Sequence, residues 1–361
     1  MIPNRQGRSR TYPGSHRAIA GPAALAALIG LGCISAVPAS DQPGQQPPPE
    51  VRHGTFRSIQ FENDVWGSGD DRFYSHGTEL AYLSLKSKPA WLTRIAGHVP
   101  FFAMGDIQAV QYTVGQQIFT PEDTQASALI EDDRPYAGWL YGSAELLSRI
   151  DSGRDYQVGN LLGLTLGVVG PSSYAEQVQK GFHDLIDVDK PQGWDNQLKD
   201  EPGILLTYTR KWQYFREGPW DTQFESAPHV VGALGNVYTY GGGGIMFRWG
   251  EGLRNDSAPP NIRPGFPGVP YLRPSVETSW YVFAGVEARA MAHNIFLDGN
   301  TFRDSHSVDK KPLVADVQLG FAFQHQRWRI SLSNVWRSRE FDGQDENTQF
   351  GAINISFFLP D

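Results

Sequence analysis

The feature that most constrains the fold of this chain is an alternation of apolar and polar side chains that recurs in many segments. From Leu313 to Phe323 the odd positions are apolar, whereas Asp316 and Gln318 stand between them. A period of two predicts β-strands with one apolar face. Many of these segments are about as long as the ~9–11 residues that a tilted strand needs to cross a bilayer. The pattern therefore predicts strands that either line a protein core or span a membrane.

Aromatic residues at the ends of the segments help to decide between these possibilities. A water-soluble sandwich also alternates, but it turns its apolar face inward. Membrane barrels carry Trp and Tyr at both membrane–water interfaces. The aromatic residues at segment ends are Trp139 and Tyr141, Trp212 and Tyr214, Tyr238 and Tyr240, Trp249, Trp280 and Tyr281, Trp328 and Trp336. Together with a charged fraction of only 19%, this arrangement favours a barrel in an outer membrane.

Twelve segments show the strand pattern, and one segment between them shows a helical pattern. The predicted strands are 56–62, 77–85, 108–118, 138–148, 157–169, 203–213, 222–235, 237–249, 279–290, 313–326, 327–336 and 346–358. Single-chain bacterial barrels have such an even number of strands. Val178, Phe182 and Leu185 have the spacing of an amphipathic helix. We therefore predict an all-β fold: a transmembrane antiparallel up-and-down β-barrel of about twelve strands, with a short helical loop near 174–188.

The first residues of the chain predict export. Four arginines precede an apolar run over residues 18–37, and Val37-Pro38-Ala39 forms a small-residue cleavage pattern. We predict a signal peptide at 1–39, a disordered spacer at 40–54 and an outer-membrane barrel domain at 55–361. The one cysteine, Cys33, lies in the predicted leader, so the exported chain would have no disulfide. The net charge of −8 argues against a nucleic-acid partner.

A polar cluster lies between the first two predicted strands. Asn63 and Asp64 follow the first strand, and Ser75 and His76 come shortly before the second. If the two strands pair as a hairpin, Asn63, Asp64 and Ser75 meet at one rim, where they would hold a hard cation or a developing oxyanion. The alternative is a polar hairpin loop whose Asp, Ser and Gly residues serve only turn geometry.

The helical loop carries a second candidate. His183 stands within the predicted helix, and Asp187 and Asp189 follow at its end. A long loop with its own helix between barrel strands is usually functional. The alternative for His183 is an ordinary surface residue of a helix. The other histidines that we considered show no ligand spacing and receive no role: His53, His98, His229, His293, His306 and His325.

A set of short motifs follows one another in a fixed order along the chain. They are Asn63-Asp64, Tyr74-Ser75-His76-Gly77, Gln117–Pro121, Asp133–Trp139, and the series Gly170-Pro171, Gln177, His183, Gly193-Trp194, Gln197-Leu198 and Glu201-Pro202. This ordered set resembles the lipid A 3-O-deacylase family of outer-membrane barrels, over most of the chain from about Phe56 onward. The resemblance implies a twelve-stranded barrel that hydrolyses the acyl ester at the 3′ position of lipid A and depends on Ca²⁺.

Matched position by position, the resemblance implies five site residues. They are Asn63, Asp64, Ser75, His183 and Asp189, with Asp187 competing for the role of Asp189. These side chains suit ester hydrolysis: His183 would take a proton from water, and Asp189 would orient its ring. A Ca²⁺ held by Asp64 would polarise the ester carbonyl, while Asn63 and Ser75 would either donate hydrogen bonds near the same oxygen or fix the metal ligands. The spacing also leaves open Ser75 as a nucleophile with His183 as its base.

The implied partners are lipid A or lipopolysaccharide as substrate and the lipids of the outer membrane, and we expect a monomer. The family would use a pair of basic residues to bind the lipid A phosphates. This sequence shows no counterpart of that pair, because residues 120–133 contain no Lys or Arg. Arg134, Lys180 or Lys190 would have to replace it. Two other classes remain open. An outer-membrane phospholipase would pair a serine nucleophile with a histidine, and a non-catalytic barrel such as a porin would need no His183 on a looped-out helix.

Overall fold

The computed structural model describes residues 54–64, 73–85, 89–99, 102, 104–105, 107–151, 153, 155–258 and 275–360. The chain divides into two compact units, Met1–Pro49 and Glu50–Asp361, and the described residues all belong to the second. The predicted signal peptide and the predicted spacer up to residue 53 lie outside the described residues. No helix in the described part of the chain is both long and apolar enough to cross a membrane.

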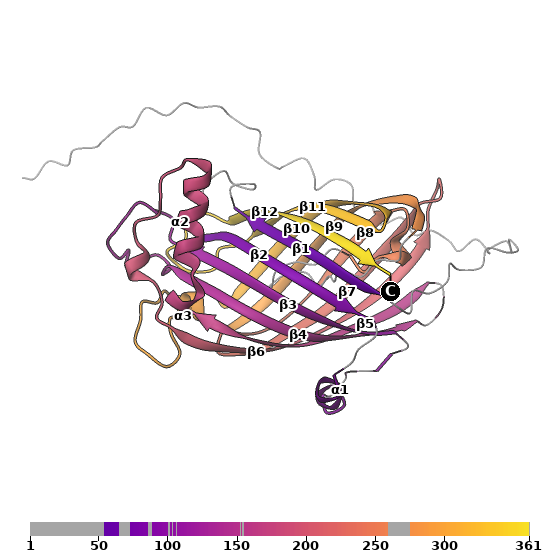
Figure 1. Cartoon of the computed structure of the whole chain (residues 1–361), viewed down its shortest axis with the longest axis horizontal. Helices are drawn as coiled ribbons and strands as arrows, with labels where there is room; N and C mark the ends of the chain where they lie inside the picture. The colour runs from indigo at the N-terminus through magenta and orange to yellow at the C-terminus, as the bar shows by residue number, and fades with distance from the viewer. Residues whose placement is uncertain are drawn as a thin grey trace, which may run out of the picture. The chain divides into compact units, whose positions relative to one another are not determined.

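Twelve strands form one closed antiparallel barrel (Figure 1). They are β1 (Thr55–Asn63), β2 (Phe73–Ser84), β3 (Ile107–Thr120), β4 (Ala137–Asp151), β5 (Tyr156–Val169), β6 (Glu201–Glu217), β7 (Gln223–Gly235), β8 (Tyr238–Gly250), β9 (Ser275–Asn294), β10 (Leu313–Gln326), β11 (Trp328–Arg337) and β12 (Thr348–Leu359). Each strand pairs with its neighbours in sequence, and β1 pairs with β12. The predicted up-and-down barrel of twelve strands is confirmed.

The largest differences from the predicted strands lie at the starts of β2 and β9 and at the ends of β6 and β9. β2 begins at Phe73 rather than at residue 77, because Phe73 and Tyr74 pair with the end of β3. Ser75 and His76 of the polar cluster therefore belong to a strand and not to a loop. β9 begins at Ser275 and is the longest strand of the barrel, with 20 residues.

The apolar faces of the strands point outward and the polar faces point into the barrel. In β9, Val286 is 50% exposed, whereas Glu287 beside it is 2% exposed. The outer band includes Leu80, Tyr82, Tyr112, Val114, Leu166, Ile204, Leu234, Phe247, Phe321 and Leu332. A soluble sandwich has the opposite arrangement, so the faces agree with a barrel that contacts lipid.

Apolar side chains fill the interior at one end of the barrel. The short helix α3 (Ile295–Asp298) buries Ile295 and Phe296 among inward-facing aromatic residues of the strands. Burial raises the pKa of the Asp298 carboxyl, but hydrogen bonds from His293, from the Asn294 amide and from Lys310 outweigh it and hold this pKa below its usual range. Ionised Asp298 therefore helps to hold α3 in place.

A buried ionic network fills the interior at the other end. Residues 251–258 after β8, which contain the 3₁₀ turn η3 (Leu253–Asn255), fold back into the barrel. Asp256 accepts hydrogen bonds from Arg329 at 2.7 Å and from the Tyr281 hydroxyl at 3.1 Å. Arg248 pairs with Glu225 and donates to the Asp256 carbonyl oxygen. Because these charges are buried, each depends on its partners for stability.

Two further helices lie in connections between strands. α1 (Ala90–Ala96) stands between β2 and β3, and α2 (Ala175–Ile186) stands between β5 and β6, which confirms the predicted helical loop. The 3₁₀ turns η1 (Pro171–Ser173) and η2 (Trp194–Asn196) flank α2. Figure 1 shows α2 and α3 at one end of the barrel, here called the loop end. The other end carries α1, the start of β1 and the end of β12, and is called the terminal end.

Candidate functional site

The β1–β2 hairpin brings together two polar segments that are separate in the sequence. Asn63, the last residue of β1, lies opposite His76 of β2. Its side-chain amide donates a hydrogen bond of 2.7 Å to the carbonyl oxygen of Ser75. Asp64 follows directly and is only 1% exposed, and Ser75 is equally buried. The structure thus places Asn63, Asp64 and Ser75 together at the loop end.

A β-bulge at Ser75 reshapes the start of β2. The register with β3 shifts between Tyr74 and His76. Tyr74 faces inward, where its hydroxyl donates to Glu62 at 2.9 Å, while His76 lies on the same outer face as Leu80 and Tyr82. The Ser75 hydroxyl lies 2.6 Å from the hydroxyl of Thr120, the last residue of β3. Bulges often change the direction of a side chain beside an active site. Here Ser75 is the extra residue, and its side chain contacts the end of β3.

Burial and backbone conformation distinguish this segment from an ordinary turn. Turn residues normally lie on the surface, but the Asp64 carboxylate is buried, which is costly unless hydrogen bonds or a cation stabilise the charge. Phe73, at the start of β2, has a φ of 67°, a conformation that residues other than Gly seldom adopt. Its ring packs on Phe341, which holds it there. Such strain gathers at functional sites, so the segment has the properties of a site.

The helix α2 is docked closely against the outer side of the barrel wall. Gly138 of β4 touches the start of the helix so closely that a Cβ atom there would collide with Ser173 and Ala175. The side chain of Gln116 donates to the carbonyl oxygen of Ser173 at 2.6 Å. Further along, Trp194 donates to the side chain of Gln179 at 2.9 Å. These contacts fix the position of α2 relative to β3 and β4.

His183 lies on the side of α2 that is turned toward the barrel. Ala175, Gln179 and His183, each four residues apart, are the buried residues of the helix, and His183 is 8% exposed. Its Nδ1 atom lies 2.6 Å from the main-chain carbonyl oxygen of Asp189. The chain reaches this position because Asp187 ends the helix with a φ of 57°. His183 is therefore not the freely exposed surface residue of the alternative interpretation.

The contact with Asp189 corrects one detail of the sequence prediction. Asp189 is the partner of His183, but through its carbonyl oxygen, whereas its carboxylate side chain is exposed. Asp187, the predicted competitor, is exposed as well and caps the helix. The reason is local: the backbone after α2 folds back along the helix, which brings the carbonyl group of Asp189 to the imidazole.

One ring contact joins the helix to the hairpin. Phe182, next to His183, stacks on His76 of β2, with ring centroids 6.3 Å apart and an interplanar angle of 24°. His76 in turn lies opposite Asn63 in the strand register. The helical loop therefore contacts the β1–β2 hairpin at the loop end, on the outer side of the wall.

The residues at the rim match the kind of oxygen donor that calcium prefers, with one carboxylate. Within the described part of the chain, no three His, Cys, Asp or Glu side chains group closely enough to hold a metal ion. Calcium takes about six to eight oxygen ligands and accepts carbonyl, amide and water oxygens beside carboxylates. Asp64 with the amide and carbonyl oxygens of Asn63 and Ser75 would supply part of such a set. The donor chemistry therefore fits Ca²⁺ better than a metal that needs several His or Cys ligands.

The basic residues considered for phosphate binding differ in accessibility. The Arg134 side chain is buried, lies 3.5 Å from Glu340 and covers the ring of Phe119. Asp133, its neighbour in sequence, accepts hydrogen bonds from the main-chain amides of Glu122 and Arg134. Lys180 and Lys190 pair with acids of the helix and remain partly exposed. Arg134 is therefore structural, and the lysines are the accessible cations.

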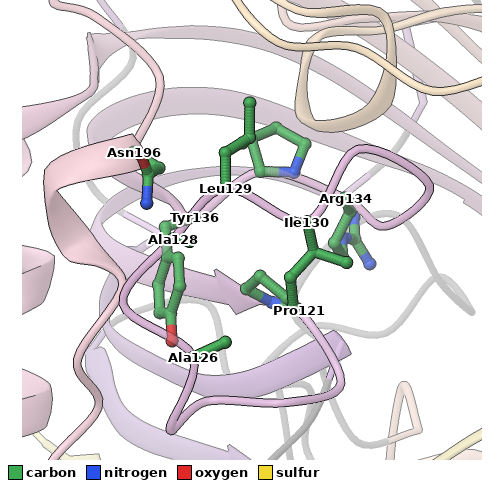
Figure 2. A pocket seen from close by; sticks show the side chains of 9 residues that line it. Pro121, Ala126, Ala128, Leu129, Ile130, Arg134, Tyr136 and Asn196 are labelled. Atoms are coloured by element: carbon green, nitrogen blue, oxygen red, sulfur yellow. The ribbon is translucent and has the colours of Figure 1, made fainter.

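A shallow pocket beside Arg134 is separate from the rim. Figure 2 shows it in the loop between β3 and β4, and it has about 220 Å³ of empty space that opens to solvent. Its lining is Pro121, Ala126, Ala128, Leu129, Ile130, Arg134, Pro135, Tyr136 and Asn196. None of the five predicted site residues lines this pocket, so it is not the candidate site.

Several residues that build the site received no role from the sequence. Thr120 lies beside Ser75, His76 and Phe182 join hairpin and helix, and Gly138 allows the helix to dock. Thr120 and Gly138 both stand in the motifs quoted above, so the order of motifs pointed to their segments. Their contacts depend on strand register and on the docking of α2, which no local pattern reports.

Comparisons with known proteins agree with this architecture. A family model described as "Outer membrane protein LpxR" matches residues 25–359. The solved structure of LpxR from Salmonella typhimurium aligns with a TM-score of 0.69 at 20% identity, over 84% of this chain and 100% of that chain. The beta domain of the Bordetella autotransporter BrkA aligns over 85% of this chain and 99% of that one, at 9% identity and a TM-score of 0.42. No curated protein matches the chain.

Proposed function

Because the chain belongs to the LpxR family of outer membrane proteins, we propose that it is an esterase that removes the 3′-linked acyloxyacyl group of lipid A. The observation that supports this proposal is the docking of α2, which buries His183 and brings the adjacent Phe182 onto His76 of the hairpin that holds Asn63, Asp64 and Ser75. Ester hydrolysis needs a base for water and positive charge or donors at the developing oxyanion. The histidine and the polar rim would provide them.

The hydrogen bond at Nδ1 determines what His183 can do. A carbonyl oxygen only accepts hydrogen bonds, so Nδ1 carries the proton and donates a hydrogen bond to the carbonyl oxygen of Asp189. The lone pair of the neutral ring is then on Nε2, the nitrogen that would take a proton from an attacking water. The carbonyl oxygen also stabilises the imidazolium that forms, because Nδ1 continues to donate to it. Asp189 thus acts through its main chain as a positioning residue.

The site's place on the outer side of the wall supports a lipid substrate. His76 and Gln116 belong to outward-facing positions of β2 and β3, and α2 packs over that face. Barrels of the outer membrane carry their long loops on the outside of the cell, where lipid A forms the outer leaflet. The exposed face of α2 bears Val178, Phe182 and Leu185. An acyl chain would reach the rim along this apolar face without leaving the membrane.

The rim residues would hold and orient the reacting ester. The Asn63 side chain binds the Ser75 carbonyl, and the Ser75 hydroxyl binds Thr120, so the rim is fixed before substrate arrives. Asp64, with oxygens of its neighbours, would hold Ca²⁺, which when bound supplies positive charge near the ester carbonyl. Preorganised donors of this kind stabilise charge that develops in the transition state.

Two features disfavour the alternative functions. For a phospholipase with Ser75 as nucleophile, the Ser75 hydroxyl should bind a histidine, but it binds Thr120. For a porin, the barrel needs an open interior, but α3 and the Asp256 network fill it at both ends. Attack by water that His183 activates is therefore the mechanism that fits the contacts best.

Mass spectrometry of lipid A from cells that make the protein tests the activity. We expect loss of the 3′-acyloxyacyl group with the intact protein and an unchanged lipid A with His183→Ala. His98→Ala, which alters an exposed histidine just after α1, is the matched control and should deacylate normally. Release of lysophospholipid instead, or deacylation by His183→Ala, would refute the proposal, and an acylated form of the protein would favour a Ser75 nucleophile.

Chelation tests the metal separately. Removing Ca²⁺ should abolish deacylation while the folded barrel keeps its migration in gels, because the fold depends on strand pairing and not on the ion. Asp64→Asn should have the same effect. Full activity in the presence of a chelator would remove the metal from the mechanism.

A further inference from the structure

The helix α1 lies against the outer wall of the barrel at the terminal end. Its two buried residues, Leu92 and Ala96, pack on Val110 of β3, Leu146 of β4 and Leu162 of β5. These three wall residues are almost fully buried, although they occupy the outward-facing positions of their strands. Val110 lies opposite Leu146, and Leu146 lies opposite Leu162. α1 therefore covers part of the wall that lipid would otherwise contact.

The contact area of α1 on the barrel wall adjoins a ring of outward-facing aromatic residues. Tyr112 follows Val110 by two positions on the same face of β3, which is about 7 Å along a strand, and it lies opposite Tyr82 of β2. Other outward aromatic residues near the terminal end are Tyr214, Phe224, Trp249 and Trp328. Such residues mark the level of a membrane–water interface. α1 therefore lies at the level of that interface.

The remaining surface of α1 is apolar at one edge and basic at another. Trp91 is 45% exposed and Ile95, one turn further on, is 39% exposed. Arg94 is exposed between them, and the helix contains no acidic residue. A Trp and an aliphatic residue beside a cation are the groups that an in-plane membrane helix presents to acyl chains and phosphate head groups.

We infer that α1 is an interfacial helix that binds glycerophospholipids of the periplasmic leaflet through Trp91, Ile95 and Arg94. The part of the wall on which α1 packs is continuous with the lipid-facing band of the barrel. Because this wall is the membrane surface of an outer membrane protein, lipid is the ligand that the exposed face of α1 would meet. The terminal end faces the periplasm, because outer-membrane barrels carry their longer loops on the cell surface and the longest connection between strands, from β5 to β6, lies at the loop end. Trp91 would insert among acyl chains, and Arg94 would bind a lipid phosphate.

This role is independent of the proposed enzymatic activity. α1 and the rim with Asn63 and Asp64 stand at opposite ends of the barrel (Figure 1). The helix would anchor the barrel at a defined depth, so that the site at the loop end lies at the level of the outer leaflet. A protein without deacylase activity would still show the contact between α1 and lipid.

Spin labelling tests the inference directly. Because Cys33 is the only cysteine of the chain, Cys33→Ser gives a background in which Trp91→Cys and Ile95→Cys each carry one nitroxide. Val114→Cys, on the lipid-facing wall, and Trp220→Cys, in the exposed turn between β6 and β7, are the two references. The labelled full-length protein is reconstituted in vesicles of phosphatidylethanolamine and phosphatidylglycerol.

The expected result is that the labels at 91 and 95 resemble the label at 114. Molecular oxygen, which dissolves in lipid, should relax them more strongly than a water-soluble nickel chelate, and the label at 220 should show the reverse. Labels at 91 and 95 that respond like the label at 220 would overturn the inference. Dipolar broadening at 91 that disappears on dilution with unlabelled protein would also overturn it, because the occupant would then be a second copy.

Discussion

A substitution at Gly138 tests whether the docking of α2 controls the activity that we propose. A Cβ atom at this position would overlap Ser173 and Ala175 and would lie 3.1 Å from the Cβ atom of Ser173. Unstrained carbon atoms stay about 3.5–4.0 Å apart, so in Gly138→Ala the start of α2 must move away from β4 by at least about half an ångström and, at the overlapping atoms, by about 1 Å or more. His183 lies on the same helix, two turns further along.

The expected loss follows from that displacement. A misplacement of about 1 Å in a catalytic group can cost about 10²-fold in rate, which corresponds to about 2.7 kcal/mol. Gly138→Ala should therefore lower the rate of lipid A deacylation by about this factor, while the barrel strands remain folded. The assay is the mass-spectrometric time course of 3′-deacylation at equal protein, with heat-dependent gel migration as the measure of folding.

Gly142→Ala is the matched control, because it adds the same methyl group on the same strand and the same outer face. The nearest atom to that methyl group would be the Thr113 carbonyl oxygen at 3.7 Å, which is an ordinary contact. We expect no change in its rate. Full activity of Gly138→Ala, or an equal loss in Gly142→Ala, would refute the idea that the fit of α2 against β4 positions His183.

Three further predictions concern single acids. Because His183 binds the carbonyl oxygen of Asp189, Asp189→Ala should keep most of the deacylase activity, and a loss of about 10–100-fold would instead indicate a carboxylate partner. Asp256→Ala leaves Arg329 buried without its acidic partner, so we expect it to lower the free energy of unfolding by about 3–5 kcal/mol. Denaturant titration of the protein in detergent measures this change. An unchanged unfolding midpoint would mean that the network adapts. Folding lowers the pKa of Asp298, so its ionised form stabilises α3 at pH values above the ordinary carboxyl pKa of about 3.9. This contribution is lost as the pH falls below that value. Hydrogen exchange at residues 295–299 should accelerate in that range, whereas Asp298→Asn should show no such step.

The architecture of the barrel was predictable because the signal is local and repeated. Successive side chains of a strand point to opposite faces, so the apolar positions from Leu313 to Phe323 had to share a face wherever the strand lay. The length of the segments and the aromatic ends then favoured lipid as the neighbour of that face. The start of β2 escaped prediction because its polar residues, from Tyr74 to His76, resemble a loop and pair with β3 only through a bulge.

The sequence located the segments that hold the candidate site residues, but it did not predict their contacts. The ordered motifs located Asn63, Asp64, Ser75 and His183, and the structure brings these residues to one end of the barrel. The partner of Arg134 is Glu340, 206 positions away in sequence. Arg134 lies between β3 and β4 and Glu340 between β11 and β12, and the closed barrel brings these two connections together at the loop end. Such pairs carry no local pattern.

The sequence by itself determined which residues form strands, which face of each strand meets lipid and which side chains are candidates for the chemistry. These properties follow from a period of two and from the identity of the side chains. Only the tertiary structure decided that Asp189 serves His183 through its carbonyl oxygen, that Thr120 binds Ser75, and that α1 lies on the outer wall. The reason is that atoms in contact are selected by strand register, by the turn after α2 and by barrel closure, and each of these depends on the whole fold.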